Sequence, residues 1–157
     1  MLKIRIIAIG KLKNIDFKNS FNEYLKMISP YANIKVEELN AEPFFDKSDK
    51  KRIKQKESFK LRKCLDKFST NKIFILDERG KDFDSEGFSR TLFNDEAQEI
   101  IFVVGGTLGL SGEILDQGNF FKISLSKLTF PHELVRVILV EQIYRAIAIN
   151  KNKSYHY

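Results

Sequence analysis

Apolar and polar residues alternate along this chain in blocks that predict a mixed α/β fold. Short apolar runs, typical of strands, occupy residues 2–9, 34–39, 73–76, 100–104 and 120–125. Between them, apolar residues recur at helical spacing over 17–28, about 49–68, about 85–96, a short stretch after Ser111, and from Pro131 to about residue 149. Strands that alternate with helices predict a largely parallel sheet with helices on both faces.

The length of 157 residues, without an internal repeat, predicts a single domain spanning 1–157. The apolar runs are too short to cross a bilayer. The basic N-terminal segment lacks a small-residue cleavage site, so we expect a cytoplasmic protein with no membrane partner. Cys64 is the single cysteine, and His132 and His156 are the two histidines. These are too few ligands for a typical metal centre, and we expect no bound metal.

Three predicted strands end in segments that suit ligand binding, because open parallel sheets bind ligands beyond the carboxyl ends of their strands. The ends are Leu76, Gly105 and Leu125. The pair Gly105-Gly106 permits a positive φ or a close approach to a ligand, although alone it is more typical of a plain strand-to-helix turn. The chain has neither a GxGxxG nor a GxxxxGK[ST] motif, so the standard dinucleotide and triphosphate sites are not predicted.

Positive charge is concentrated in one predicted helix. Residues 47–72 carry a net charge of +8 within a chain of net charge +6. A local basic face suits a polyanion such as RNA. A solvated helix face without a partner is an equally good interpretation of the charge alone. The basic stripe of the helix consists of Arg52, Lys56, Lys60, Lys63 and Lys67.

The final predicted helix is apolar around nearly its whole circumference, which indicates burial on all sides. A helix on the surface of a small domain covers its own sheet with one face, so we expect the other face to form a homodimer. Arg136 in this helix is either an ion-pair partner or a phosphate contact. His132 in its first turn is expected to make a structural hydrogen bond. The terminal Tyr155-His156-Tyr157 is either a disordered end, which physics alone favours, or an element folded onto a site.

Several segments together resemble the RlmH family of SPOUT-class methyltransferases. They are LDERGK, FVVGGTLGL, SLSKLTFPHELVRVILVEQIYRA and the terminal YHY. IIAIGKLK and EYLKMISPY also match, so the resemblance covers essentially the whole chain. It implies a homodimer that methylates N3 of a pseudouridine in 23S ribosomal RNA on the assembled ribosome. It also implies a C-terminal trefoil knot, which is too rare to be predicted from sequence patterns.

The resemblance implies that the methyl donor S-adenosylmethionine binds among the loops after three strands. The cofactor-binding residues so implied are Leu76, Gly105, Leu125, Ser126, Lys127, Leu128, Thr129 and Phe130. The RNA-binding residues expected are Arg52, Lys56, Lys60, Lys63, Lys67 and Arg136.

The family's C-terminal Tyr-His pair corresponds to Tyr155 and His156. His156 is the candidate base for removal of the N3 proton, and Tyr155 would stack on or position the target base. Many relatives end in a basic residue where this chain has Tyr157, a role that Lys151 and Lys153 would have to fill. Two alternatives remain: an RNA-binding SPOUT-fold protein without catalysis, and a methyltransferase for another RNA. The intact donor loop favours catalysis over the first.

Overall fold

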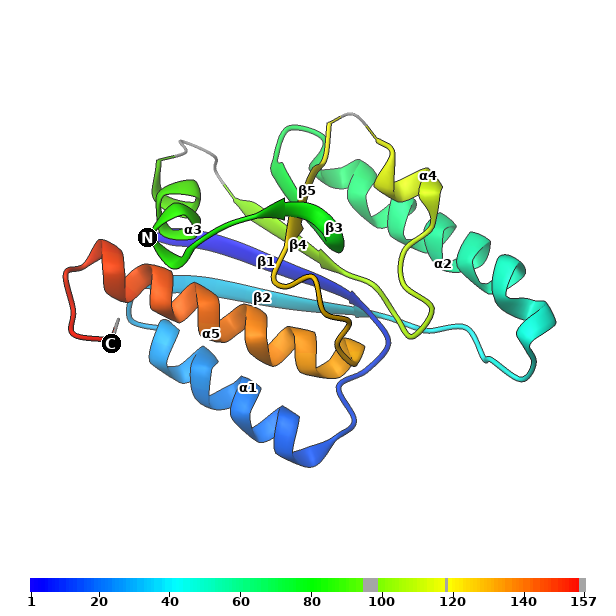
Figure 1. Ribbon diagram of the computed structural model, residues 1–157, viewed down its shortest axis with the longest axis horizontal. Coiled ribbons are helices and arrows are strands. Elements are labelled where there is room, and N and C mark those ends of the chain that lie inside the picture. Colours follow the sequence, from blue (N-terminus) through cyan, green and yellow to red (C-terminus); the bar gives the residue numbers. More distant parts are fainter. Residues whose placement is uncertain (95–98, 118, 156–157) are drawn as a thin grey trace.

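The computed structural model describes residues 1–94, 99–117 and 119–155 and contains one parallel five-stranded sheet (Figure 1). The strand order is β2-β1-β4-β3-β5, and every recorded pairing is parallel. The strands are β1 (Leu2–Ile9), β2 (Ala32–Leu39), β3 (Lys72–Asp82), β4 (Ile100–Val104) and β5 (Phe121–Ser124). The α/β architecture predicted from the sequence is confirmed, whereas the trefoil knot stays a prediction.

Helices cover both faces of this sheet (Figure 1). Helices α1, α3 and α5 lie on one face, and α2 and α4 lie on the other. The α-helices are α1 (Ile15–Ile28), α2 (Lys50–Leu65), α3 (Ser85–Phe93), α4 (Gly112–Leu115) and α5 (His132–Asn150), and 3-10 turns at Lys47–Asp49 and Asp66–Phe68 flank α2. The strands point their carboxyl ends toward the edge where α2 and α5 begin, and the described C-terminal residues lie at the opposite edge (Figure 1).

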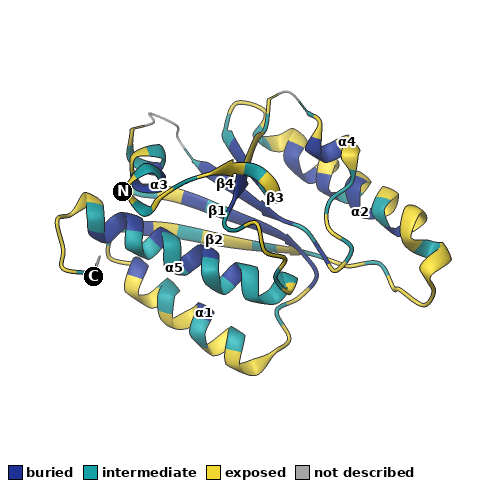
Figure 2. Ribbon diagram, in the orientation of Figure 1, coloured by how far each residue is buried: buried dark blue, intermediate teal, exposed yellow. Residues whose placement is uncertain are grey.

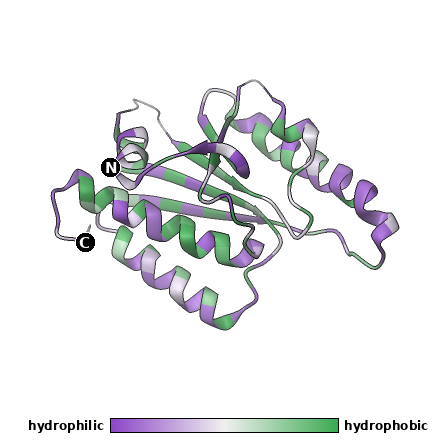
Figure 3. Ribbon diagram, in the orientation of Figure 1, coloured by the Kyte–Doolittle hydropathy of each residue, from purple (hydrophilic) through white to green (hydrophobic). Residues whose placement is uncertain are grey.

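The hydrophobic core has two halves because successive side chains of a strand point to opposite faces. In β1, Ile4 and Ile6 belong to the cluster under α1, α3 and α5, whereas Ile7 belongs to the cluster under α2 and α4. All five residues of β4 are buried, as expected for a central strand covered on both sides. Figures 2 and 3 show the buried, hydrophobic strands between helices whose outer sides are exposed and more hydrophilic.

Among the five described α-helices, α1 and α3 have a side-chain cap at their start, and α2, α4 and α5 do not. Asn14 accepts hydrogen bonds from two backbone N–H groups of α1, and Asp84 accepts one from Gly87 of α3. Asp49 precedes α2 but makes no side-chain capping bond. The helix predicted to continue to about residue 68 ends at Leu65 and passes into a 3-10 turn. The predicted end of α3 near Glu96 lies outside the described residues, and the helix stops at Phe93.

Strand β3 corrects one sequence prediction. The strand was expected to stop at Leu76, but it resumes after a four-residue irregularity and runs to Asp82. Its pairing with β5 passes from Leu76 directly to Lys81, so residues 77–80 bulge out of the ladder. A Cβ on Gly80 would lie 2.6 Å from the backbone of Ile123. The glycine therefore permits close contact between two strands and does not end one.

Helix α5 is covered more completely by its own chain than the sequence suggested. It packs against both α1 and α3. Ile143 and Ile147 are buried in the core of the single chain, and no residue from 132 to 149 is fully exposed (Figure 2). Ile143 and Ile147 are therefore explained by the core of the single chain, and the homodimer stays a prediction. Leu134 and Ile138 are only half-buried and belong to neither core cluster of the described residues.

Candidate functional site

The bulge within β3 and the loops after β4 and β5 meet at the carboxyl edge of the sheet and enclose a pocket of about 400 Å³. This volume lies within the range of small-molecule sites. The three segments that form most of the wall are residues 76–79, 104–110 and 125–130, with Lys54, His132 and Val135 completing it. The strand ends that the sequence singled out are therefore brought together by the fold.

Seven of the eight residues expected to bind a methyl donor line this pocket. They are Leu76, Gly105, Leu125, Ser126, Leu128, Thr129 and Phe130. The exception is Lys127, whose side chain is 83% exposed and whose Nζ lies 3.4 Å from a carboxylate oxygen of Asp82. The direction of a side chain within an irregular loop depends on backbone dihedral angles that the sequence motif does not specify.

Polar residues of the β3 bulge complete the pocket, although the sequence did not single them out as site residues. Thr129 Oγ1 donates to Glu78 Oε2 over 2.9 Å, which joins the loop after β5 to the β3 bulge. Hydrogen bonds from Arg79 hold the pKa of Asp77 below its usual value, so this carboxyl is ionised at neutral pH. The position of residues 77–79 directly after Leu76 was the signal in the sequence that could have identified them as site residues.

The glycine loop after β4 is shaped by contacts within the protein. A Cβ on Gly105 would lie 3.0 Å from Leu110 Cγ, and a Cβ on Gly106 would lie 2.9 Å from Ile9 Cγ2. Both glycines therefore allow close packing. The left-handed conformation that such a glycine pair permits is found instead at Gly109, with φ of +72°. A valine at Gly105 would displace the loop itself as well as filling ligand space.

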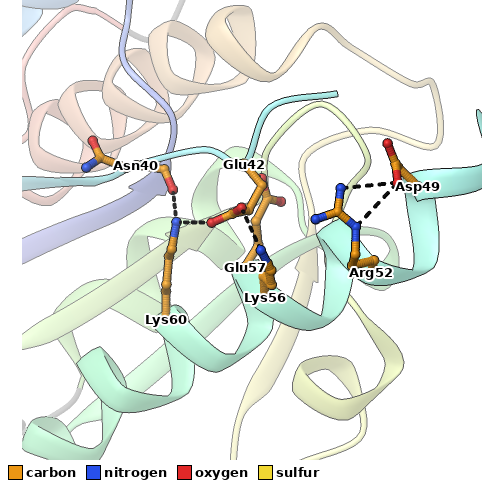
Figure 4. A network of polar contacts seen from close by, with 7 residues as sticks. All are labelled: Asn40, Glu42, Asp49, Arg52, Lys56, Glu57 and Lys60. Carbon is orange, nitrogen blue, oxygen red and sulfur yellow. Dashed lines mark hydrogen bonds and ion pairs between the residues drawn. The ribbon is translucent and has the colours of Figure 1, made fainter. Parts of the chain in front are cut away.

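Helix α2 packs against this loop through Glu57, which is drawn in Figure 4. The buried carboxyl of Glu57 lies against Gly106, with Oε2 3.4 Å from the position of an added Cβ. Its Oε1 accepts a hydrogen bond from the Glu42 backbone N–H over 3.0 Å. The hydroxyls of Ser58 and Ser111 are also hydrogen-bonded. Glu57 and Ser58 thus connect α2 with the glycine loop and with the segment that follows β2.

Comparisons with known proteins identify the family of this chain. A family model described as "Predicted SPOUT methyltransferase" matches residues 2–156. The chain belongs to this family. The resemblance noted in the sequence is thereby confirmed.

Two full-length relatives and one solved structure can be compared with this SPOUT chain. Ribosomal RNA large subunit methyltransferase H of Dictyoglomus thermophilum is 40% identical, with 99% of this chain and 100% of the relative covered. The protein of the same name from Halothermothrix orenii is 37% identical, with 99% of each chain covered. A probable methylase family protein from Haemophilus influenzae Rd KW20 is 13% identical with a TM-score of 0.50, covering 99% of this chain and 69% of that one, which supports the fold alone.

Arg136 in α5 of this SPOUT chain lies in the interior, where it holds the carboxyl end of β1. Its side chain is 1% exposed. One terminal nitrogen donates to Glu38 over 2.9 Å, and the other donates to the carbonyl oxygens of Ile9 and Gly10. Of the two roles considered for Arg136 in the sequence, the structure shows the ion pair. The expected contact with an RNA phosphate is wrong, because the guanidinium does not reach the surface.

His132 lines the pocket at the first turn of α5. Burial and the nearby Arg136 charge lower the pKa of His132, so the imidazole is neutral at pH 7. The hydrogen bonds recorded for the described residues include none from its ring, and the expected structural hydrogen bond is not found.

The tail is described only as far as Tyr155, and His156 and Tyr157 lie outside the described residues. The Tyr155 ring packs edge-on against Tyr144, with 4.7 Å between ring centroids, and Arg145 lies over it. Its hydroxyl is 3.5 Å from that of Tyr24. The Tyr24 hydrogen bond and burial raise the pKa of Tyr155 to about 12, so its phenol stays protonated at neutral pH.

The basic stripe on α2 contains one residue with a different role. Arg52, Lys56, Lys63 and Lys67 are exposed. Lys60 is half-buried, and its Nζ binds a carboxylate oxygen of Glu42 over 2.5 Å and the carbonyl oxygen of Asn40 over 2.9 Å (Figure 4). Lys60 therefore fastens the segment after β2 to α2, while the other four side chains are accessible to a partner. None of the helices in the described parts of the chain is long and apolar enough to cross a membrane.

Proposed function

We propose that this chain is an S-adenosylmethionine-dependent methyltransferase that methylates N3 of a pseudouridine in 23S ribosomal RNA on the assembled ribosome. The observation that carries the proposal is the convergence of the β3 bulge with the loops after β4 and β5, with seven of the eight expected donor-binding residues in one pocket. Full-length relatives named ribosomal RNA large subunit methyltransferase H support the RNA class. An enzyme acting on ribosomes would work in the cytoplasm.

The pocket fits the proposed donor in size and in chemistry. Leu76, Val104 and Leu125 provide apolar walls, and the irregular loops 105–110 and 126–130 provide backbone polar groups. Such groups suit a ligand that has an aromatic base, a ribose and an amino acid. When bound, S-adenosylmethionine supplies a methyl group on a sulfonium, which requires alignment with the nucleophile. We infer that the β3 bulge and these two loops hold the donor. The Glu78–Thr129 hydrogen bond fixes the bulge to the loop after β5.

The acceptor nitrogen carries a proton at neutral pH, and its removal requires a base or groups that favour the anion. Tyr155 does not suit this role, because its raised pKa keeps the phenol protonated. We propose His156 as the base and assign Tyr155 to positioning the tail against Tyr144.

The position of Tyr155 supports a dimer. Helix α5 has 19 residues, or roughly 28 Å at 1.5 Å per residue. The pocket lies at its first residues and Tyr155 lies beyond its last ones. A tail held where Tyr155 lies does not reach the pocket of its own chain. We propose that a second copy brings its tail to this pocket, which makes the homodimer part of the active site.

A labelled methyl-transfer assay tests the proposed function. The substrate would be ribosomes from a strain that lacks this modification, with purified 23S RNA as a second substrate. Incorporation on ribosomes, mapped to N3 of a single pseudouridine, is the expected result. Donor binding without incorporation into either substrate would favour an RNA-binding protein without catalysis. Incorporation into another RNA would change the substrate assignment and leave the donor pocket intact.

A further inference from the structure

We propose that the outer face of α2 binds an unpaired stretch of RNA, with one base stacked on the ring of Phe59 and phosphates on the surrounding cations. This inference rests on the proposed function, because it concerns how the same enzyme holds its RNA. It adds the conformation of the bound RNA and an aromatic contact that charge alone does not predict.

The first observation is that Phe59 is exposed in the middle of α2, a helix whose inner face is buried. The inner face of α2 is buried and consists of Ile53, Glu57, Ser58, Leu61, Cys64 and Leu65. The outer face is exposed and consists of Lys51, Arg52, Gln55, Lys56, Phe59, Arg62 and Lys63. Phe59 is 70% exposed. Within α2, every residue of which the structure describes, it is the only apolar side chain on the outer face.

Cations surround this ring on the helix surface. Lys56, Arg62 and Lys63 lie three or four positions from Phe59, which places them next to it on the same face. Among the described residues, no carboxylate pairs with Lys63. Lys56 and Arg62 have carboxylate oxygens at 3.6 Å, from Glu42 and Glu113. Exposed pairs of this kind contribute little, so RNA phosphates can replace them.

The combination of one ring with several cations excludes other classes of partner. A second copy would place the same cations against each other, which is repulsive. A membrane requires an apolar stripe, and the apolar face of α2 is already buried in the core. In an RNA duplex the bases are stacked inside, beyond the reach of a phenyl ring. An unpaired base offers a free face, and stacking on an aromatic side chain is the usual way in which proteins bind it.

The location of α2 suits an RNA strand that also enters the pocket. Lys54 of the same helix lines the pocket, and Phe59 lies about 7.5 Å farther along the helix axis. The clamp formed by Glu42, Glu57 and Lys60 fixes this part of α2 to the preceding segment (Figure 4). Phe59 is therefore presented on a rigid surface, within reach of nucleotides that flank a base in the pocket.

The absence of tryptophan from the sequence allows a direct test. In a Phe59→Trp variant of the full-length protein, the indole would be the single tryptophan, and stacking on a base would quench its fluorescence. The probe is a single-stranded RNA 12-mer, titrated with and without its annealed complement. The matched control is Ile15→Trp, because Ile15 is 64% exposed on α1, on the other face of the sheet. Saturable quenching by the single strand, weaker quenching by the duplex, and no quenching of the control are expected.

An affinity measurement completes the test. Phe59→Ala should weaken binding of the 12-mer by about 5- to 150-fold, the range for loss of one stacked base, and Phe59→Tyr should restore it. Donor binding by Phe59→Ala should equal that of the original chain. Unchanged RNA affinity of Phe59→Ala, equal quenching by duplex, or a change in oligomeric state would overturn the inference. Failure of the methyl-transfer assay with normal Phe59→Trp quenching would sink only the catalytic proposal.

Discussion

Arg136 is the least exposed charged side chain among the described residues, and it connects three elements. From α5 it pairs with Glu38 in β2 and donates to two carbonyl oxygens at the end of β1. Burial lowers the pKa of Arg136, while Glu38 favours the charged form. A charge that is removed from water in this way depends on these partners, because a buried charge without them is costly.

Replacing Arg136 with methionine should lower the free energy of unfolding by about 3 kcal/mol, because Glu38 and the two carbonyl groups would lose their donor. Urea denaturation monitored by circular dichroism measures the change. Arg90→Met is the matched control, since Arg90 is 63% exposed and its loss should cost less than about 0.5 kcal/mol. Equal midpoints for the two variants would contradict the structural role of Arg136.

His156→Asn should reduce methyl transfer by about 100-fold or more, the usual contribution of a general base, while leaving donor affinity unchanged. This single substitution is cleaner than deleting residues 155–157, because Tyr155 also packs on Tyr144 and Arg145. The measurement is the single-turnover rate at saturating ribosome, with Tyr157→Phe as the control. A normal rate for His156→Asn would show that the N3 proton leaves by another route.

At the scale of elements, α2 has a different role on each face. Its inner face supports the glycine loop through Glu57 and Ser58, and its outer face carries the accessible cations. Lys60 lies between these faces and belongs to the clamp with Glu42. Substitutions on this helix therefore separate RNA binding from donor binding only if Lys60 is left in place.

Replacing Lys51, Lys63 and Lys67 with glutamine should weaken ribosome binding and lower the slope of log affinity against log salt by about 2 to 3, because fewer counterions would be released. Affinity for the ribosome measured between 50 and 200 mM salt gives this slope. The expected change corresponds to the loss of about three phosphate contacts. The control triple is Lys13, Lys18 and Lys26, all exposed around α1. Methylation at saturating ribosome should be nearly normal. If both triples give the original slope, the basic face is solvated and has no partner.

Glu57 should make stability depend on pH in a specific direction. Burial raises the pKa of Glu57 above its ordinary value of 4.5. The folded state therefore retains this proton to higher pH than the unfolded state does. The stability contributed by the protonated carboxyl is complete below pH 4.5 and is lost as the pH rises through the folded-state pKa.

Glu57→Gln should remove this component, because an amide does not ionise and its oxygen still accepts from the Glu42 N–H. Urea denaturation at pH 5 and at pH 8 compares the two proteins. The original chain should lose more stability than the variant between these values, whereas Glu86→Gln, an exposed control, should behave like the original chain. An equal loss of stability in the original chain and in Glu57→Gln would show that Glu57 is not the source of the pH dependence.

At the scale of the whole molecule, the proposed homodimer requires a surface on which two copies would associate. The apolar circumference of α5 is largely covered by α1 and α3, so its composition alone does not establish a partner. Leu134 and Ile138, four positions apart, remain half-buried and outside both core clusters. Together with the distance between Tyr155 and the pocket, they indicate the side of α5 that a second copy would cover.

Ile138→Glu should convert a dimer of about twice 18.3 kDa into a folded monomer that lacks methyl transfer, because a buried unpaired charge is costly. Sedimentation equilibrium at micromolar concentration measures the mass. Lys26→Glu on α1 serves as the charge control and should remain dimeric. A monomeric original chain would overturn the dimer and the proposal that the tail acts on the partner's pocket.

The sequence by itself determined the elements and the region of the site. The run at 100–104 matches β4 residue for residue, because a strand buried on both faces must be apolar at every position. The pocket could be located from Leu76, Gly105 and Leu125, because parallel strands bring their carboxyl ends to one edge. These features depend on local composition and on a general rule of parallel sheets.

Only the tertiary structure decided which groups face one another. The role of Gly80 depends on the backbone of Ile123, which would lie 2.6 Å from an added Cβ, and that of Arg136 depends on Glu38 nearly a hundred residues earlier. Lys60 and Lys63 are equivalent in the sequence pattern, yet one is fastened to Glu42 and the other is accessible. Such outcomes depend on contacts between segments distant in sequence, which hydrophobic periodicity does not encode. The pattern of residues thus predicted where chemistry would gather, and the packing of the chain assigned each side chain its partner.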